Sequence, residues 1–156
     1  MERLLDKSQL EAVAEIELRY KTKVKASQRP KIKTSEDAAA IFRGIWEEDR
    51  IEFIEEFKIL LLNRSNAVLG FVNISTGGVA GTVADPKLIM AAALKANASG
   101  IILSHNHPSG SLRTSKADED LTKKIKLAAD FMDLKLLDHL ILTKEEYYSF
   151  ADNGLI

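Results

Sequence analysis

The sequence predicts an α/β fold in which a mixed β-sheet is flanked by helices. Three observations support this prediction. Segments with apolar residues at helical spacing alternate along the chain with short apolar runs typical of buried strands. The run at residues 101–103 is apolar throughout and lies between two such helices, as expected for a central strand covered on both faces. Turn residues at 63–66 separate two strand-like segments, which predicts a hairpin.

Each element has its own local signal. An N-cap pattern at residues 34–37 predicts a helix that runs to about residue 49. Asp85 followed by Pro86 predicts the start of a second helix, which ends near residue 98. The remaining elements are an edge strand with alternating apolar and charged residues at 13–25, strands at 57–62, 67–75 and 134–143, and a helix at 115–133.

Composition limits the classes of function. The 156 residues, 46% of them hydrophobic, suffice for a core that folds unaided. No apolar run is long enough to cross a bilayer and the first residues lack a secretory pattern, so we expect a cytoplasmic protein with no membrane partner. Because the chain has no cysteine, nitrogen and oxygen atoms must hold any metal ion. The net charge of −1 creates no global field that would attract nucleic acid, although residues 19–33 are rich in lysine and arginine.

The residues with clear chemistry follow the central strand. His105 and His107 are separated by one residue, and on an extended backbone both imidazoles point to the same side and can reach one ion. Pro108 then ends the strand, at the edge where open α/β sheets place their ligands. A His-x-His pair by itself is weak evidence, because histidines at strand ends are often only hydrogen-bonded.

Asp118 strengthens the interpretation as a metal site. It lies three residues before Leu121 and seven before Ile125, which places its carboxylate on the inward stripe of the predicted helix. An inward carboxylate needs a cation or several donors. The structural alternative is a capping box formed with Ser115, and both roles are compatible. Two histidines and one aspartate leave one position of a tetrahedral zinc ion open, as in a hydrolytic site.

Two further roles stay open at this point. A proton acceptor for water on the metal is needed, and the carboxylates that precede the first core strand are candidates: Glu55, Glu56 and, more weakly, Glu52. His139 alternates with Leu137 and Ile141 along a predicted strand, which favours a buried, hydrogen-bonded histidine over one that lines a cleft or orients a metal ligand.

These residues resemble a known signature. The pattern begins with His105-x-His107-Pro108, and seven residues separate His107 from Ser115-x-x-Asp118. It is similar to the JAMM (MPN+) metalloprotease motif. The segment HNHPSG at 105–110, together with the Leu-Asp-His triplet that ends at His139, resembles the RadC branch of that superfamily. The similarity runs from about residue 32 to residue 156, which divides the chain into an N-terminal extension, 1–31, and a RadC-like JAB/MPN domain, 32–156.

The resemblance implies a three-layer fold like that of cytidine deaminase and a zinc ion held by His105, His107, Asp118 and water. It also implies that Glu55 is the general base and that Ser115 stabilises the oxyanion. We therefore expect a zinc metallopeptidase or isopeptidase in which zinc-bound water attacks a peptide-type carbonyl of a peptide or protein substrate. Two alternatives are a DNA-associated protein, either a repair accessory or a nuclease, and a non-catalytic MPN interaction module.

Overall fold

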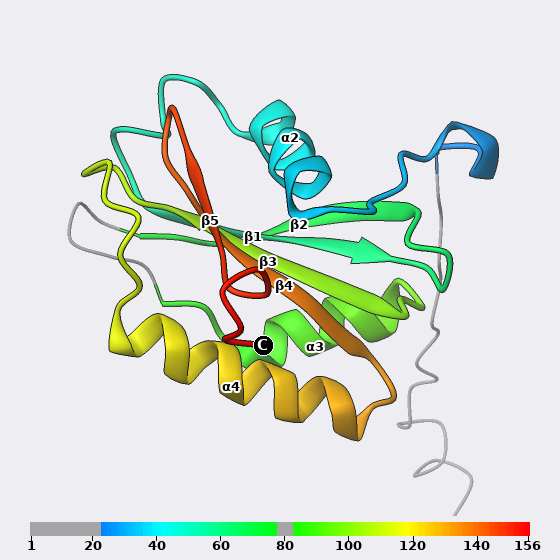
Figure 1. The fold of residues 1–156 in the computed structure, drawn as a ribbon. Helices are drawn as coiled ribbons and strands as arrows, with labels where there is room; N and C mark the ends of the chain where they lie inside the picture. Colours follow the sequence, from blue (N-terminus) through cyan, green and yellow to red (C-terminus); the bar gives the residue numbers. More distant parts are fainter. Residues whose placement is uncertain (1–22, 78–82) are drawn as a thin grey trace, which may run out of the picture.

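The computed structural model describes residues 23–77 and 83–156, which form three layers (Figure 1). A mixed sheet lies in the middle, helix α2 covers one face, and helices α3 and α4 cover the other. The α/β fold with helices on both sides of a mixed sheet is therefore confirmed. In chain order the elements are η1 (Ala26–Gln28), α2 (Ser35–Ile45), β1 (Glu56–Leu62), β2 (Val68–Thr76), α3 (Pro86–Lys95), β3 (Gly100–Asn106), α4 (Lys116–Phe131), β4 (Lys135–Leu142) and β5 (Tyr147–Ser149).

The strand order across the sheet is β2-β1-β3-β4-β5. β3 is central as predicted, and each of its residues is buried. It pairs antiparallel with β1 and parallel with β4, and α4 makes the crossover that a parallel pair requires. The loop that leaves the carboxyl end of β3 therefore leads directly into the first turn of α4.

Alternation along the strands divides the core into two clusters. In β1, Phe57, Ile59 and Leu61 pack toward α3 and α4, and Leu60 and Leu62 pack toward α2. Every residue of β1 is buried, including the charged Glu56 and Lys58. The two faces of this strand are consequently distinct environments, which matters for the carboxylates at its start.

The predicted helix starts are correct, whereas one predicted end is wrong. Thr34, Asp85 and Ser115 are the N-caps of α2, α3 and α4, and each side chain accepts a backbone N–H of its own helix. Helix α2 ends at Ile45 and not near residue 49. Trp46 is extended, with ψ of 134°, and the three acidic residues that follow it would oppose the helix dipole at a C-terminus.

Two short elements have no strong signal in the sequence: the 3-10 turn η1 and strand β5. β5 is only three residues long and pairs antiparallel with the end of β4. The edge strand predicted at residues 13–25 lies outside the described residues, except for its last three, which are not in a strand. No helix among the described residues is long and apolar enough to span a membrane.

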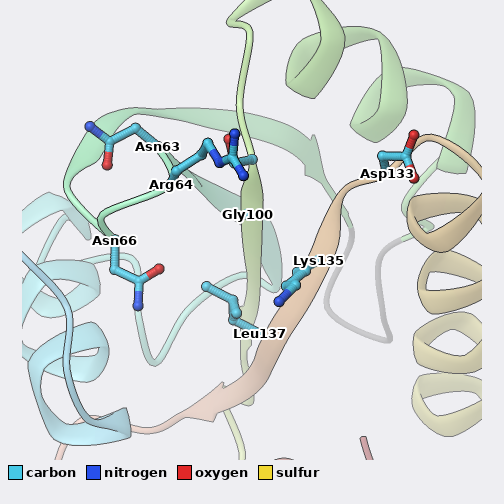
Figure 2. A pocket seen from close by; sticks show the side chains of 8 residues that line it. Asn63, Arg64, Asn66, Gly100, Asp133, Lys135 and Leu137 are labelled. Atoms are coloured by element: carbon cyan, nitrogen blue, oxygen red, sulfur yellow. The ribbon is translucent and has the colours of Figure 1, made fainter.

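A polar pocket of about 660 Å³ lies at the end of the sheet where β3 begins (Figure 2). It is lined by Gly100, Lys135 and Leu137 and by residues of the β1–β2 turn, including Arg64. His105 is at the other end of β3, so this pocket is separate from the histidine pair. Its charged lining side chains are exposed and give it no built binding group.

The buried face of α4 can be tested by substitution, because this helix also carries Asp118. Ile125 is completely buried, whereas the side chain of Leu127 on the same helix is 64% exposed. We expect Ile125→Ala to lower the free energy of unfolding by about 2–5 kcal/mol, since it leaves a cavity. The control Leu127→Ala should change it by less than about 0.5 kcal/mol. Urea unfolding measures both, and equal losses would contradict the orientation of α4.

Candidate metal centre

The two histidines of the motif lie at the carboxyl end of β3. His105 is within the strand, is 1% exposed and pairs in register with Phe57, whose ring stacks on the imidazole. His107 follows the strand, and its N–H still donates to the carbonyl of Leu142 in β4. Its extended backbone turns the second imidazole to the side of the first, and the two Nε2 atoms are 3.0 Å apart. The structure therefore brings the pair together as predicted.

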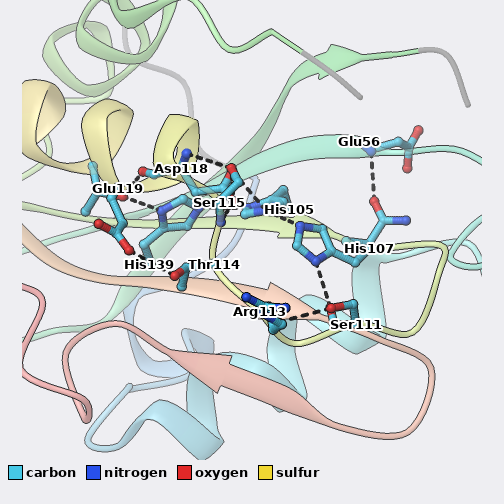
Figure 3. A network of polar contacts seen from close by, with 12 residues as sticks. Glu56, His105, His107, Ser111, Arg113, Thr114, Ser115, Asp118, Glu119 and His139 are labelled. Carbon is cyan, nitrogen blue, oxygen red and sulfur yellow. Dashed lines mark hydrogen bonds and ion pairs between the residues drawn. The ribbon is translucent and has the colours of Figure 1, made fainter. Parts of the chain in front are cut away.

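The loop after His107 is short and tightly bonded. The N–H of Gly110 donates to the carbonyl of His107, and Gly110 has φ of 76°, which a glycine adopts without strain. The chain then returns so that the carbonyl of Ser111 accepts the Nδ1–H of His107 at 2.7 Å. This bond orients the imidazole and leaves its Nε2 facing His105 (Figure 3).

Asp118 lies in the first turn of α4 and uses its two carboxylate oxygens differently. Oδ2 accepts the N–H and the hydroxyl of Ser115, at 2.8 Å and 2.6 Å, and so completes the capping box. Oδ1 points toward the histidines and is 3.4 Å from Nε2 of His105. Capping and an inward, metal-facing position are thus both present in one side chain (Figure 3).

His139 is completely buried and is bonded directly to His105. Its Nε2 is 2.9 Å from Nδ1 of His105, and its Nδ1 is 2.7 Å from Oγ1 of Thr122. The prediction of a buried, hydrogen-bonded histidine is correct, and the bond goes to one of the three converging side chains. The expected alternation with Leu137 is wrong, because a register shift in the β3–β4 pairing sends Leu137 to the α2 face.

The hydrogen bonds that link Asp118, Thr122, His139 and His105 fix the positions of their protons. The hydroxyl of Thr122 donates to the carbonyl of Asp118 at 2.6 Å, so toward His139 it can only accept. Burial holds the pKa of His139 well below its usual value, and the ring is neutral with its proton on Nδ1. Its Nε2 must then accept the Nδ1–H of His105.

The bonds at Nδ1 of His105 and of His107 leave the Nε2 lone pairs of both imidazoles at the centre of the site. Burial lowers the pKa of His105 to about 4, against the opposing effect of Asp118 and with a further lowering from His107. With its proton on Nδ1, neutral His105 has no proton on Nε2. The Nδ1–H of His107 donates to the carbonyl of Ser111, so Nε2 is the ring nitrogen that faces His105.

This donor set suits a metal ion. The ligand atoms of His105, His107 and Asp118 lie within 4.8 Å of one another. Two lone pairs and one carboxylate oxygen that converge without a proton between them repel one another unless a cation lies among them. Imidazole nitrogen and carboxylate oxygen in this number suit zinc, with one coordination position left open.

The structure separates the three acidic residues that were candidates for the base. Glu56 is buried on the α2 face of β1, where its carboxylate pairs with Lys58 at 2.9 Å and with Arg50 at 3.0 Å. Glu52 is exposed and pairs with Lys144 at 3.0 Å. Glu55 immediately precedes β1 and is half-buried, with its carbonyl bonded to the N–H of Gly77.

Asn106, between the two histidines, has a clear structural role that sequence reasoning missed. Alternation along β3 turns it to the α2 face, where it is completely buried. Its side-chain amide bonds to the segment that precedes β1, which carries Glu55. The signal in the sequence was its place inside the quoted HNHPSG segment, but nothing local indicated a partner about 50 residues away.

A second pocket, of about 260 Å³, adjoins the histidine pair. It is lined by His107 and by the turn that follows it, including Pro108 and Gly110. The opposite wall comes from Glu52 and from residues 143–146 after β4. His107 therefore lines an open pocket, whereas His105 is enclosed.

Comparison with known proteins agrees with the fold and with this site. The family model described as a RadC-like JAB domain matches residues 32–155. A UPF0758 protein of Flavobacterium johnsoniae is 48% identical over 125 residues, which cover 80% of this chain and 53% of the relative. A UPF0758 protein of Porphyromonas gingivalis is also 48% identical, over 103 residues, which cover 65% of this chain and 45% of the relative. The chain thus spans about half the length of these relatives.

Thr122 offers a test of the proton assignment. Thr122→Val keeps the shape of the side chain but removes the acceptor of the His139 Nδ1–H, so His139 is free to change tautomer. We expect the affinity for zinc to fall about 10–100-fold. Thr122→Ser, which keeps the hydroxyl, should stay close to the wild-type affinity. Competition with a chromophoric chelator measures both affinities. An unchanged zinc affinity in Thr122→Val would show that the hydrogen bonds from Thr122 through His139 do not orient His105.

Proposed function

Because this chain belongs to the RadC-like JAB domain family, we propose that it is a zinc-dependent metallohydrolase, a metallopeptidase or isopeptidase that cleaves peptide-type bonds. The observation that carries the proposal is the convergence of two imidazole nitrogens and one carboxylate oxygen at one point. His105, His107 and Asp118 would hold the ion. When bound, zinc would act as a Lewis acid that lowers the pKa of water and polarises a carbonyl.

Glu55 is the proposed general base. Phe57 packs toward α3 and α4, on the same face as His105, and Glu55 is two residues before it. If the alternation of β1 continues back by one residue, the carboxylate of Glu55 would point to the face with the proposed metal ligands. The carboxylate of Glu56 instead pairs with Lys58 and Arg50 on the opposite face. In this role Glu55 takes a proton from the attacking water and delivers it to the leaving amine.

Ser115 is the proposed oxyanion donor. Its hydroxyl donates to Oδ2 of Asp118, which also accepts the backbone N–H of Ser115. Because the N–H alone can keep the capping box closed on that oxygen, the hydroxyl is able to turn to the developing oxyanion. Its position is exposed at the start of α4, next to the proposed metal ligand.

A peptide or protein chain, linked through an α-amide or an isopeptide bond, is the proposed substrate class. The pocket beside His107 is open to solvent and large enough to admit a side chain. The proposal also includes the cytoplasmic location expected from the sequence. A non-catalytic interaction module is disfavoured, because it would not need two imidazoles and a carboxylate that face one another.

A DNA-associated role is the second candidate. Within the basic stretch of residues 19–33, the structure describes one arginine and four lysines. Arg29 is half-buried, and the four lysines are exposed: Lys23, Lys25, Lys31 and Lys33. Exposed lysines of this kind contact phosphate groups without reading sequence. DNA binding that weakens steeply with salt and is lost when these lysines are replaced would favour this candidate, and it is compatible with hydrolysis at the separate histidine site.

The decisive assay is a hydrolysis panel with the zinc-loaded protein. It contains fluorogenic peptides, a fluorogenic ε-amide of lysine as an isopeptide probe, and single-stranded and duplex DNA. We expect cleavage of an amide substrate, and we expect Glu55→Gln to lower kcat by about 10²–10⁴-fold with no loss of bound zinc, because the base is not a ligand. Zinc content is measured by elemental analysis of each variant.

Glu48→Gln is the matched control, because Glu48 is an exposed acidic side chain of the same loop that does not line the pocket beside His107. It should keep nearly full activity. If Glu55→Gln stays fully active while Glu56→Gln loses activity without unfolding, the assignment of the base is wrong. Cleavage of DNA alone would overturn the peptidase proposal.

A further inference from the structure

The motif that supplies two metal ligands also fixes the segment that carries the proposed base. Asn106 lies between His105 and His107, and the alternation that turns the histidines to one face turns Asn106 to the other. There its side chain is completely buried and reaches the loop that precedes β1. The three consecutive residues therefore connect both faces of the sheet at the same point.

Every hydrogen-bonding group of the Asn106 amide is used, and each partner lies close to Glu55. The Oδ1 atom accepts the N–H of Glu56 at 2.8 Å, and Figure 3 marks this bond at Glu56. The Nδ2 atom donates to the carbonyl of Ile54 at 2.9 Å and to that of Ile51 at 2.8 Å. The residues immediately before and after Glu55 are thus both bonded to one side chain.

The backbone of Glu55 itself is held from a third direction. Its carbonyl accepts the N–H of Gly77 at 2.8 Å, which continues the β1–β2 pairing by one step. With the peptide groups on both sides bonded to Asn106, the backbone from which the Glu55 side chain extends is held in place. A carboxylate that must meet a water molecule on a metal tolerates little displacement, because a shift of about 1 Å can cost about 10²-fold in rate.

We propose that Asn106 is a positioning residue for Glu55 and sets the distance between the base and the metal ligands. This inference rests on the proposed hydrolytic function. Asn106 contacts neither substrate nor metal; it acts through the backbone on each side of Glu55. Since His105, Asn106 and His107 are consecutive, any movement of the two proposed ligands also moves Asn106, which holds the backbone beside Glu55.

The experiment compares Asn106→Ala with Ser104→Ala. Ser104 is the matched control because it is completely buried on the same strand and the same face, and its hydroxyl has no hydrogen-bond partner. Three quantities are measured for each zinc-loaded variant: zinc affinity by chelator competition, amide hydrogen exchange of residues 51–57, and kcat and KM on the amide substrate found with the panel.

We expect Asn106→Ala to keep its zinc affinity within about twofold, to exchange the amide of Glu56 faster, and to lose roughly 10–100-fold in kcat with little change in KM. Ser104→Ala should match the wild type in all three. The double variant Asn106→Ala with Glu55→Gln should be no slower than Glu55→Gln alone, because effects that pass through one residue are not additive. A purely structural role of Asn106 would not produce this lack of additivity.

Three outcomes would overturn the inference: an unchanged kcat in Asn106→Ala, a loss of zinc affinity equal to that of kcat, or a further loss in the double variant. If Asn106→Ala does not fold, Asn106→Asp replaces it, since it keeps the acceptor for Glu56 and removes both donors. A wild-type protein that cleaves no amide would overturn the proposed function and the catalytic role of Asn106 together. The exchange rates then distinguish a wrong proposed function from a wrong role of Asn106, because they report whether Asn106 holds the backbone beside Glu55 without any turnover.

Discussion

The site depends on the hydrogen bond between His105 and His139. His105 is enclosed by the core, so solvent cannot satisfy the hydrogen bonds of its imidazole in another tautomer or ring orientation. The chain from the Asp118 carbonyl through Thr122 and His139 leaves one proton arrangement in which every donor has an acceptor. A buried donor without a partner costs about 1–3 kcal/mol, which is enough to make that arrangement dominant. Two of the proposed ligands, His105 and Asp118, are thereby the two ends of one chain of bonds.

The position of the site follows from the connection between β3, α4 and β4. β3 and β4 are parallel neighbours, so α4 must cross back over the sheet and begins close to where β3 ends. That brings the first turn of α4, with Asp118 and Ser115, beside His105 and His107. Antiparallel pairing of β1 with β3 places the start of β1 at the same edge, where Phe57 is opposite His105. The proposed base, far earlier in the sequence, immediately precedes that start.

The sequence was sufficient for the parts of the site that depend on local pattern. The His-x-His spacing and the position of Asp118 one helical turn after Ser115 both translate directly into geometry, and the three side chains do converge. Strands β1 to β4 and the starts of the α-helices were also predictable, because caps and apolar runs are local signals. The end of α2 was not, because the helical spacing continues to Trp46, whereas Trp46 is extended and its indole packs beside Phe42 and Lys58.

Longer-range features were beyond the sequence pattern. Glu55 and Glu56 are indistinguishable by composition, and only the partners Arg50 and Lys58 show that Glu56 belongs to the opposite face. The face of His139 depends on a register shift in β4 that moves Leu137 aside, and strict alternation assigned Leu137 incorrectly. The roles of Thr122 and Asn106 likewise depend on partners that are distant in sequence.

The most direct test of the account is X-ray absorption spectroscopy at the zinc edge on the stoichiometrically loaded protein. We predict a four-coordinate shell of nitrogen and oxygen atoms at about 2.0–2.1 Å from the zinc ion, two of them from imidazoles, and the loss of this shell in His105→Ala. A third imidazole in the shell would show that His139 is a ligand and not the partner of His105. A protein that binds no zinc, or whose zinc shell is unchanged by His105→Ala, would contradict the metal centre itself.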